Sequence, residues 1–225
     1  MSERETEFPK LDEHLAEMRI LQRNASAHHG FIKYLTTHPE LNDKYTDSFT
    51  GHLVKLQIDS VISSSIMLVC SLWDRNGHSL PEFAKAVSDK ADSIKRQRKK
   101  WRSEWTDEML GLLEVDKRLA EFIDKVTTLA NSQEISAIRV HRDEEIAHPL
   151  KGRSGQRRKY EKAHGIYEPA KYDDLINLLE KSSELVSDAI SIWHFEVISH
   201  ADISDWFQRY SETYWTKLPT FSEIE

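Results

Sequence analysis

The sequence predicts an all-α fold, a helical bundle in a single domain spanning residues 1–225, and three observations support this prediction. Only 7 glycines and 6 prolines occur among the 225 residues, too few turn-forming residues for a protein built of many short strands. Hydrophobic residues make up 39% of the chain, which is enough to fill a core. They recur at the three- and four-residue intervals of an amphipathic helix.

The first half of the chain predicts three helices. Helical spacing of apolar residues covers about residues 11–35 and again about residues 48–73. Ser79 followed by Glu82 is typical of a helix start, because the two side chains can cap each other's backbone N–H groups. The helix that begins there is expected to continue to about residue 102.

The middle of the chain predicts two helices and a loop. Helices are expected at about residues 116–130 and 133–147. Pro149 cannot continue a helix and moves His148 out of the helical conformation, so the second helix ends at or just before His148. We expect residues 150–169 to form a basic loop, since a segment of this length in a compact domain is usually functional.

The last third predicts a long helix from near Tyr172 and an aromatic C-terminal helix at about residues 203–217. Aromatic residues follow helical spacing in the second of these, namely Trp206, Phe207, Tyr210 and Tyr214. We expect this aromatic face to pack on the chain's own core rather than in a dimer interface or against nucleic-acid bases.

Composition also indicates a compartment. Cys70 is the only cysteine, so one chain can form neither a disulfide framework nor a thiolate metal cluster. The first residues lack the pattern of a signal peptide, and no run approaches the ~18 apolar residues of a membrane span. The net charge of -7 argues against general nucleic-acid binding, whereas local basic segments suit a selective anionic partner. We expect a cytoplasmic protein with no membrane partner.

The segment from Arg142 to His148 holds the residues best suited to chemistry. A permanently charged guanidinium and an imidazole that can titrate near neutral pH lie six residues apart at a helix end. When an RNA 2′-hydroxyl attacks the adjacent phosphate, Arg142 can bind the charged phosphoryl oxygens while His148 transfers a proton. The substrate supplies the nucleophile, so we expect no metal and no cofactor. Asp143 is the candidate to orient Arg142 or His148.

Helical geometry separates Arg142 from His148. Six steps along an ideal helix place the two side chains about 120° apart, so they do not share one stripe. Because Pro149 frees His148 from that geometry, the imidazole can turn toward Arg142 or toward the same motif in a second copy. The plainer alternative is a charged, exposed helix end without chemistry.

Three segments resemble one known superfamily. Arg142-Asp143 followed by Ala147-His148 at the end of a late helix resembles the signature of HEPN (higher eukaryotes and prokaryotes nucleotide-binding) domains. Residues 56–62, running on to residues 72–74, and the helix start at residues 171–175 resemble the abortive-infection U-type group of that superfamily. The resemblance to this group extends over roughly residues 10–200.

The resemblance implies an all-α HEPN-like bundle with additional helices. It also implies a metal-independent endoribonuclease of the toxin or antiviral defence type, which would leave 2′,3′-cyclic phosphate and 5′-hydroxyl ends. Arg142, Asp143 and His148 would be catalytic, with two such motifs facing each other in a homodimer. An antitoxin or another defence-system protein is the partner that such toxins have. Leu150 stands where toxins paired with a nucleotidyltransferase antitoxin often have Tyr, which argues against that regulation.

The basic loop is the candidate RNA-binding segment. Its cations would attract the RNA backbone with strong salt dependence. They are Lys151, Arg153, Arg157, Arg158, Lys159 and Lys162. Without the neighbouring motif, the same loop fits an ordinary solvated segment.

Two alternatives stay open at this point. His141, Glu145 and His148 lie within about 60° of one another on a helix face, a stripe that can hold zinc, although no other histidine has a spacing that completes the site. The chain can also be a non-catalytic HEPN-like module that binds RNA or assembles a defence complex.

Overall fold

The computed structural model describes residues 8–45, 49–147, 154–196 and 199–218, and every regular element in these ranges is helical. This confirms the all-α prediction. In chain order the elements are α1 (Pro9–Thr37), α2 (Glu40–Tyr45), α3 (Phe49–Trp73), α4 (Leu80–Val87), α5 (Ala91–Trp101), a 3₁₀ turn (Leu112–Glu114), α6 (Val115–Ala130), α7 (Gln133–His141), a π-helical turn (Arg142–Ala147), α8 (Gly155–His164), α9 (Tyr172–His194) and α10 (His200–Lys217).

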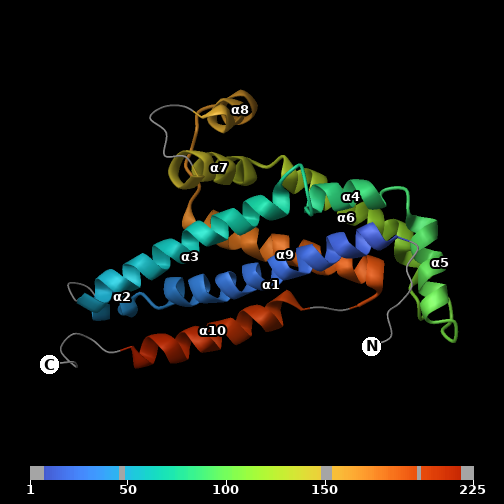
Figure 1. The fold of residues 1–225 in the computed structure, drawn as a ribbon, viewed down its shortest axis with the longest axis horizontal. Coiled ribbons are helices and arrows are strands. Elements are labelled where there is room, and N and C mark those ends of the chain that lie inside the picture. Colours follow the sequence, from blue (N-terminus) through green and yellow to red (C-terminus); the bar gives the residue numbers. More distant parts are fainter. Residues whose placement is uncertain (1–7, 46–48, 148–153, 197–198, 219–225) are drawn as a thin grey trace.

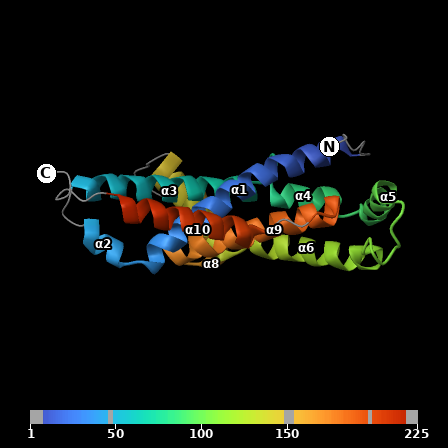
Figure 2. The same ribbon diagram turned by 90° about the horizontal axis from the view of Figure 1, so that it is seen from below.

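The longest helices form the body of the molecule (Figure 1). α1 packs against α3, α9 and α10, and α9 also contacts α3, α6 and α7. Seen from below, α5 lies at one end of this body (Figure 2). α8 is the outermost helix and rests on α7, on the opposite side of the molecule from α10 (Figure 1).

Two buried tryptophans fix the ends of the long helices in the core. The indole of Trp73, at the end of α3, donates a hydrogen bond to Ser182 Oγ on α9 at 2.8 Å. The indole of Trp193, near the end of α9, donates to Asp12 Oδ1 on α1 at 2.7 Å. Because a buried indole N–H without a partner is costly, these bonds set where α3 and α9 end relative to their neighbours.

The helix predicted from Ser79 to about residue 102 is two helices, α4 and α5. The Ser79 hydroxyl makes no capping bond, and the Ser79 carbonyl instead accepts from His14 Nε2 at 2.9 Å. On α5, the buried Arg98 donates to the carbonyl oxygens of Leu110 at 2.9 Å and Ile192 at 2.7 Å. Satisfying this buried guanidinium requires α5 to meet the end of α9, and a straight continuation of α4 does not provide that contact.

The prediction of a loop over residues 150–169 was wrong, because α8 occupies Gly155–His164. The Ser154 hydroxyl caps this helix by accepting from the Arg157 backbone N–H at 3.0 Å. Tyr160 is buried against Ala137 and Val140 of α7. A capped helix held by one aromatic anchor therefore replaces most of the expected loop.

The prediction that the aromatic face of the last helix packs on the core was also wrong. Trp206, Tyr210 and Tyr214 are 51%, 55% and 44% exposed. α10 instead turns Ser204, Ser211 and Trp215 inward, and Trp215 packs against Phe31 of α1. A Cβ added at Gly30 would lie 2.3 Å from the Ser204 carbonyl oxygen, so the two backbones approach closely at Ser204 and leave no room there for a large side chain.

α3 carries a stretch, Thr50–Trp73, that is long and apolar enough to cross a membrane, with a mean hydropathy of 1.5 in its best window. This stretch was not expected from the sequence, because polar residues interrupt it and no unbroken run of ~18 apolar residues occurs. Core helices of soluble proteins meet the same criterion, and Val69, Leu72 and Trp73 are buried in the main core. The exposed apolar residues of α3 include Leu53 and Leu56.

Candidate functional site

The segment predicted as one helix over residues 133–147 changes type at Arg142. Ser132 caps α7 by accepting from the Ile135 backbone N–H at 3.2 Å, and α7 ends at His141. Arg142–Ala147 then form a π-helical turn. Such turns are wider than an α-helix and occur often at functional sites. The ideal α-helical geometry assumed for the 120° separation is therefore not followed over residues 142–147, and His148 lies outside the described residues.

Arg142 is held by two carboxylates. Its Nε donates to Asp143 Oδ1 at 2.9 Å, and its Nη2 lies 2.9 Å from the same oxygen. Its Nη1 lies 3.4 Å from Asp74 Oδ1, just beyond the end of α3. Burial lowers the pKa of Arg142, but Cys70 and these two carboxylates raise it more, so the net shift is upward. The structure thus brings Arg142 and Asp143 into direct contact.

Arg139 connects α7 to the end of α3. Its guanidinium donates to the backbone carbonyl of Trp73, the last residue of α3. Because Trp73 is itself fixed in the core, the residues that follow it, Asp74 and Arg75, are placed beside Arg142. The end of α3 thereby becomes one wall of the site.

A basic pocket of about 520 Å³ lies between the end of α3, α7 and α8. Among the described residues, four cationic side chains line it, Arg75, Arg139, Arg142 and Lys159, and Asp74 is the only carboxylate. An excess of positive charge with planar guanidinium donors suits a phosphate-bearing ligand. We call this cavity the cationic pocket.

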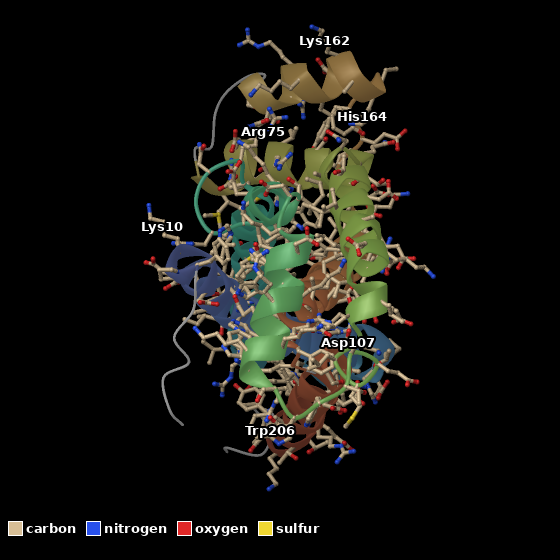
Figure 3. The ribbon with its side chains drawn as sticks, turned by 90° about the vertical axis from the view of Figure 1, so that its right-hand side faces the viewer. Lys10, Arg75, Asp107, Lys162, His164 and Trp206 are labelled. Atoms are coloured by element: carbon tan, nitrogen blue, oxygen red, sulfur yellow. The ribbon has the colours of Figure 1, made fainter. Side chains whose placement is uncertain are left out.

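His164 is an imidazole in the cationic pocket that the sequence analysis did not select. Its Nε2 lies 3.2 Å from Ser136 Oγ on α7, and its ring packs 5.1 Å from the ring of Tyr160. In Figure 3, His164 and Arg75 lie on the inner side of α8, while Lys162 points away from the body. Recognising α8 from its Ser154 cap would have placed Lys159 and His164 on one helix.

α8 is tied directly to the π-helical turn through Glu144. The carboxylate accepts from the Ser154 backbone N–H at 2.9 Å and lies 3.1 Å from Arg157 Nη2. Arg157 also stacks over the Tyr167 ring, 4.3 Å from its centroid. This carboxylate therefore joins the turn that carries Arg142 to the helix that covers the cationic pocket.

The structure describes six of the nine predicted site residues, and among these Arg142 and Asp143 are in contact while Lys159 lines the cationic pocket with Arg142. His148, Lys151 and Arg153 lie outside the described residues, and so does Pro149. Arg157 is engaged by Glu144, Lys159 lines the cationic pocket, and Arg158 and Lys162 are exposed on α8. Arg75, Arg139 and His164 are added by the structure. The alternative zinc set of His141, Glu145 and His148 includes a residue outside the described ranges and stays a prediction.

One comparison with known proteins finds a match. The model of the AbiU2 family, HEPN_AbiU2, matches residues 8–214, which is most of the 225-residue chain. The match spans the cationic pocket and the π-helical turn. No curated protein and no solved structure matches the chain significantly.

Proposed function

This chain belongs to the AbiU2 family of HEPN proteins, and we propose that it is a metal-independent endoribonuclease of the toxin or antiviral defence type. It cuts RNA to 2′,3′-cyclic phosphate and 5′-hydroxyl ends. The observation that supports this most strongly is the position of Arg142 in a pocket whose described lining holds three further cations and one carboxylate. Such a pocket attracts the phosphate backbone, whose binding is dominated by charge.

Arg142 supplies the charge stabilisation in the proposed reaction. The 2′-oxygen forms a bond to phosphorus while the bond from phosphorus to the 5′-oxygen breaks, and negative charge accumulates on the phosphoryl oxygens. The contacts to Asp143 and Asp74 occupy three of the five N–H donors of the guanidinium. The remaining two donors have no partner among the described residues and would bind a phosphate, while Asp143 holds the guanidinium plane in place.

His148 transfers the proton in this proposal. One imidazole accepts the proton of the 2′-hydroxyl, and a protonated imidazole gives one to the leaving 5′-oxygen. A homodimer that brings two copies of the segment together would supply both. The exposed aromatic face of α10 lies across the molecule from α8 (Figure 3), so a dimer through that face would keep the two cationic pockets apart. A site built from two copies of this segment requires the two subunits to contact each other near the π-helical turn.

The proposal is tested by the rate of RNA cleavage in purified variants. We expect Arg142→Ala to lower the rate by about 10²–10³-fold and His148→Ala by about 10²–10⁴-fold. Arg19→Ala on α1 and His52→Ala on α3 remove the same groups at exposed positions and should cut at the wild-type rate. Wild-type cleavage by His148→Ala, or loss of cleavage in chelator while the protein stays folded, would contradict the proposal.

The variant His164→Ala distinguishes whether the imidazole of His148 or that of His164 transfers the proton. If His148 transfers the proton, His164→Ala changes the rate much less than His148→Ala does. A larger effect at His164 would move the proton transfer to the imidazole that lines the cationic pocket.

One observation favours a second candidate function. Asp143 and Asp74 already pair with Arg142, as they would if the guanidinium only joined the end of α3 to the π-helical turn. The chain would then be a non-catalytic module that binds RNA or a defence-system partner such as an antitoxin. RNA binding without new RNA ends, unchanged in the double variant Arg142→Ala and His148→Ala, is the result expected for that function.

A further inference from the structure

Three potential metal ligands meet where α1, α9 and α10 converge. They are His29 on α1, Glu180 on α9 and His200, the first residue of α10, and their ligand atoms lie within 4.8 Å of one another. His29 and His200 are 3% and 6% exposed, and Glu180 is half-buried. α10 lies across the molecule from α8 (Figure 1), so this cluster is separate from the cationic pocket.

Serine side chains orient both imidazoles. Nδ1 of His29 lies 2.7 Å from Ser204 Oγ, and Nδ1 of His200 lies 2.7 Å from Ser26 Oγ. When each Nδ1–H donates to its serine, each Nε2 presents a lone pair. Metal-binding histidines are characteristically held in this way by a hydrogen bond at the other ring nitrogen.

His200 Nε2 is buried and has no hydrogen-bond partner among the residues that the structure describes. Buried polar atoms are nearly always paired, so an unpaired one calls for an explanation such as a bound ion.

The surrounding surface carries more negative than positive charge. Glu184, Asp188 and Asp205 line the same pocket as Glu180, together with Lys33 and Lys125. Lys125 pairs with Asp188 at 3.5 Å, which leaves Lys33 as the cation that opposes the other carboxylates.

We propose that His29, His200 and Glu180 bind a divalent first-row transition ion, with zinc as the best match. Two imidazole nitrogens and one carboxylate oxygen are a donor set that zinc accepts, and water can fill the fourth position. Ligand atoms on tetrahedral zinc lie about 3.4 Å apart, given bonds of about 2.1 Å. The distances between ligand atoms, at most 4.8 Å, therefore need to shorten by no more than about 1.4 Å for the three side chains to bind one ion. The ion joins α1, α9 and α10 and holds the beginning of α10 in place.

Full-length protein stripped of metal and titrated with Zn²⁺ tests the site by calorimetry and thermal unfolding. We expect one ion per chain and a rise in Tm of about 5–10 °C at a free Zn²⁺ concentration 100 times the Kd. Cobalt(II) added in place of zinc should give visible absorption bands of a low-symmetry site. Neither readout depends on ribonuclease activity.

Glu180→Gln tests the proposed carboxylate ligand, and Glu184→Gln is its matched control. They lie one turn apart on α9 and line the same pocket, but only Glu180 belongs to the ligand cluster. We expect Glu180→Gln to lose the Tm shift and the cobalt bands and Glu184→Gln to keep both. His52→Ala, at an exposed histidine, should also keep them.

Ser204→Ala keeps the test decisive if a histidine variant fails to fold. It removes only the hydroxyl that orients His29 and should weaken zinc binding about 10–100-fold. Absence of stoichiometric zinc binding in the wild-type chain, or equal loss in Glu180→Gln and Glu184→Gln, would overturn the proposal.

Discussion

Replacing Lys159 with Gln is expected to remove one contact between the protein and an RNA phosphate, and so to make RNA binding less dependent on salt concentration. Lys159 is exposed on α8 and lines the cationic pocket with Arg75, Arg139 and Arg142. Each cation that neutralises a phosphate of single-stranded RNA contributes about -0.7 to the slope of log affinity against log salt concentration. Four such contacts give a slope of about -2.8, and the variant should show about -2.1.

These slopes correspond to measurable differences in affinity. When salt rises fourfold, from about 50 to about 200 mM, the wild-type affinity should fall about 50-fold and that of Lys159→Gln about 20-fold. Fluorescence anisotropy of a labelled single-stranded RNA over that range measures both slopes.

Lys10→Gln is the control, because it removes one positive charge from the protein at a position outside the cationic pocket. Lys10 is exposed on α1, away from α8 (Figure 3), so the variant should keep the wild-type slope. If Lys10→Gln flattened the slope as much as Lys159→Gln, or if neither changed it, the cationic pocket would not be the surface that binds the RNA backbone.

Three further predictions concern stability. Trp73→Ala should lower the free energy of unfolding by about 3–5 kcal/mol in urea, because the indole is fully buried, and a loss below 1 kcal/mol would contradict its anchoring role. Gly30→Ala should destabilise the protein by about 1–3 kcal/mol or more, since its Cβ would meet the Ser204 carbonyl, and an unchanged Tm would argue against the close packing of α1 on α10. Burial raises the pKa of Glu144, but hydrogen bonds from Ser154 and the charge of Arg157 lower it more, so the net shift is downward. Its stabilising contribution is therefore present above the ordinary Glu value of about 4.3 and is lost as pH falls through the lower folded value. The protection factors of α8 amides, which correct for the pH dependence of intrinsic exchange, should therefore fall under acid conditions. Glu144→Gln should show the same loss of protection at neutral pH, and protection equal to that of the wild type would refute the link between Glu144 and α8.

Helical periodicity predicted the long elements because each buries a continuous apolar stripe. α9 begins at Tyr172, the position predicted from the sequence, and α3 ends at Trp73, also as predicted. The same periodicity did not reveal the π-helical turn, since the pattern of residues 142–147 fits an α-helix equally well. α8 was missed because Tyr160 is its only fully buried apolar anchor and Arg157, Arg158, Lys159 and Lys162 give the rest of the helix the composition of a solvated segment.

The side chains that gather around Arg142 come from segments far apart in the sequence. Arg139 lies one turn before Arg142, but its partner, the Trp73 carbonyl, follows from how α3 and α7 pack. His29 and His200 show the same limit, because the spacing of histidines along the chain does not tell which helices meet. Local patterns give the elements, while tertiary packing decides which polar groups face one another.

Cleavage of an RNA with a single 2′-deoxy nucleotide tests the central claim most directly. An oligonucleotide that the wild-type protein cuts at one position is compared with the same oligonucleotide lacking the 2′-hydroxyl at that position, with chelator present. The account predicts 2′,3′-cyclic phosphate ends from the first RNA and no cut at that position in the second. A cut in the deoxy-substituted RNA, or 3′-hydroxyl ends from either substrate, would contradict it.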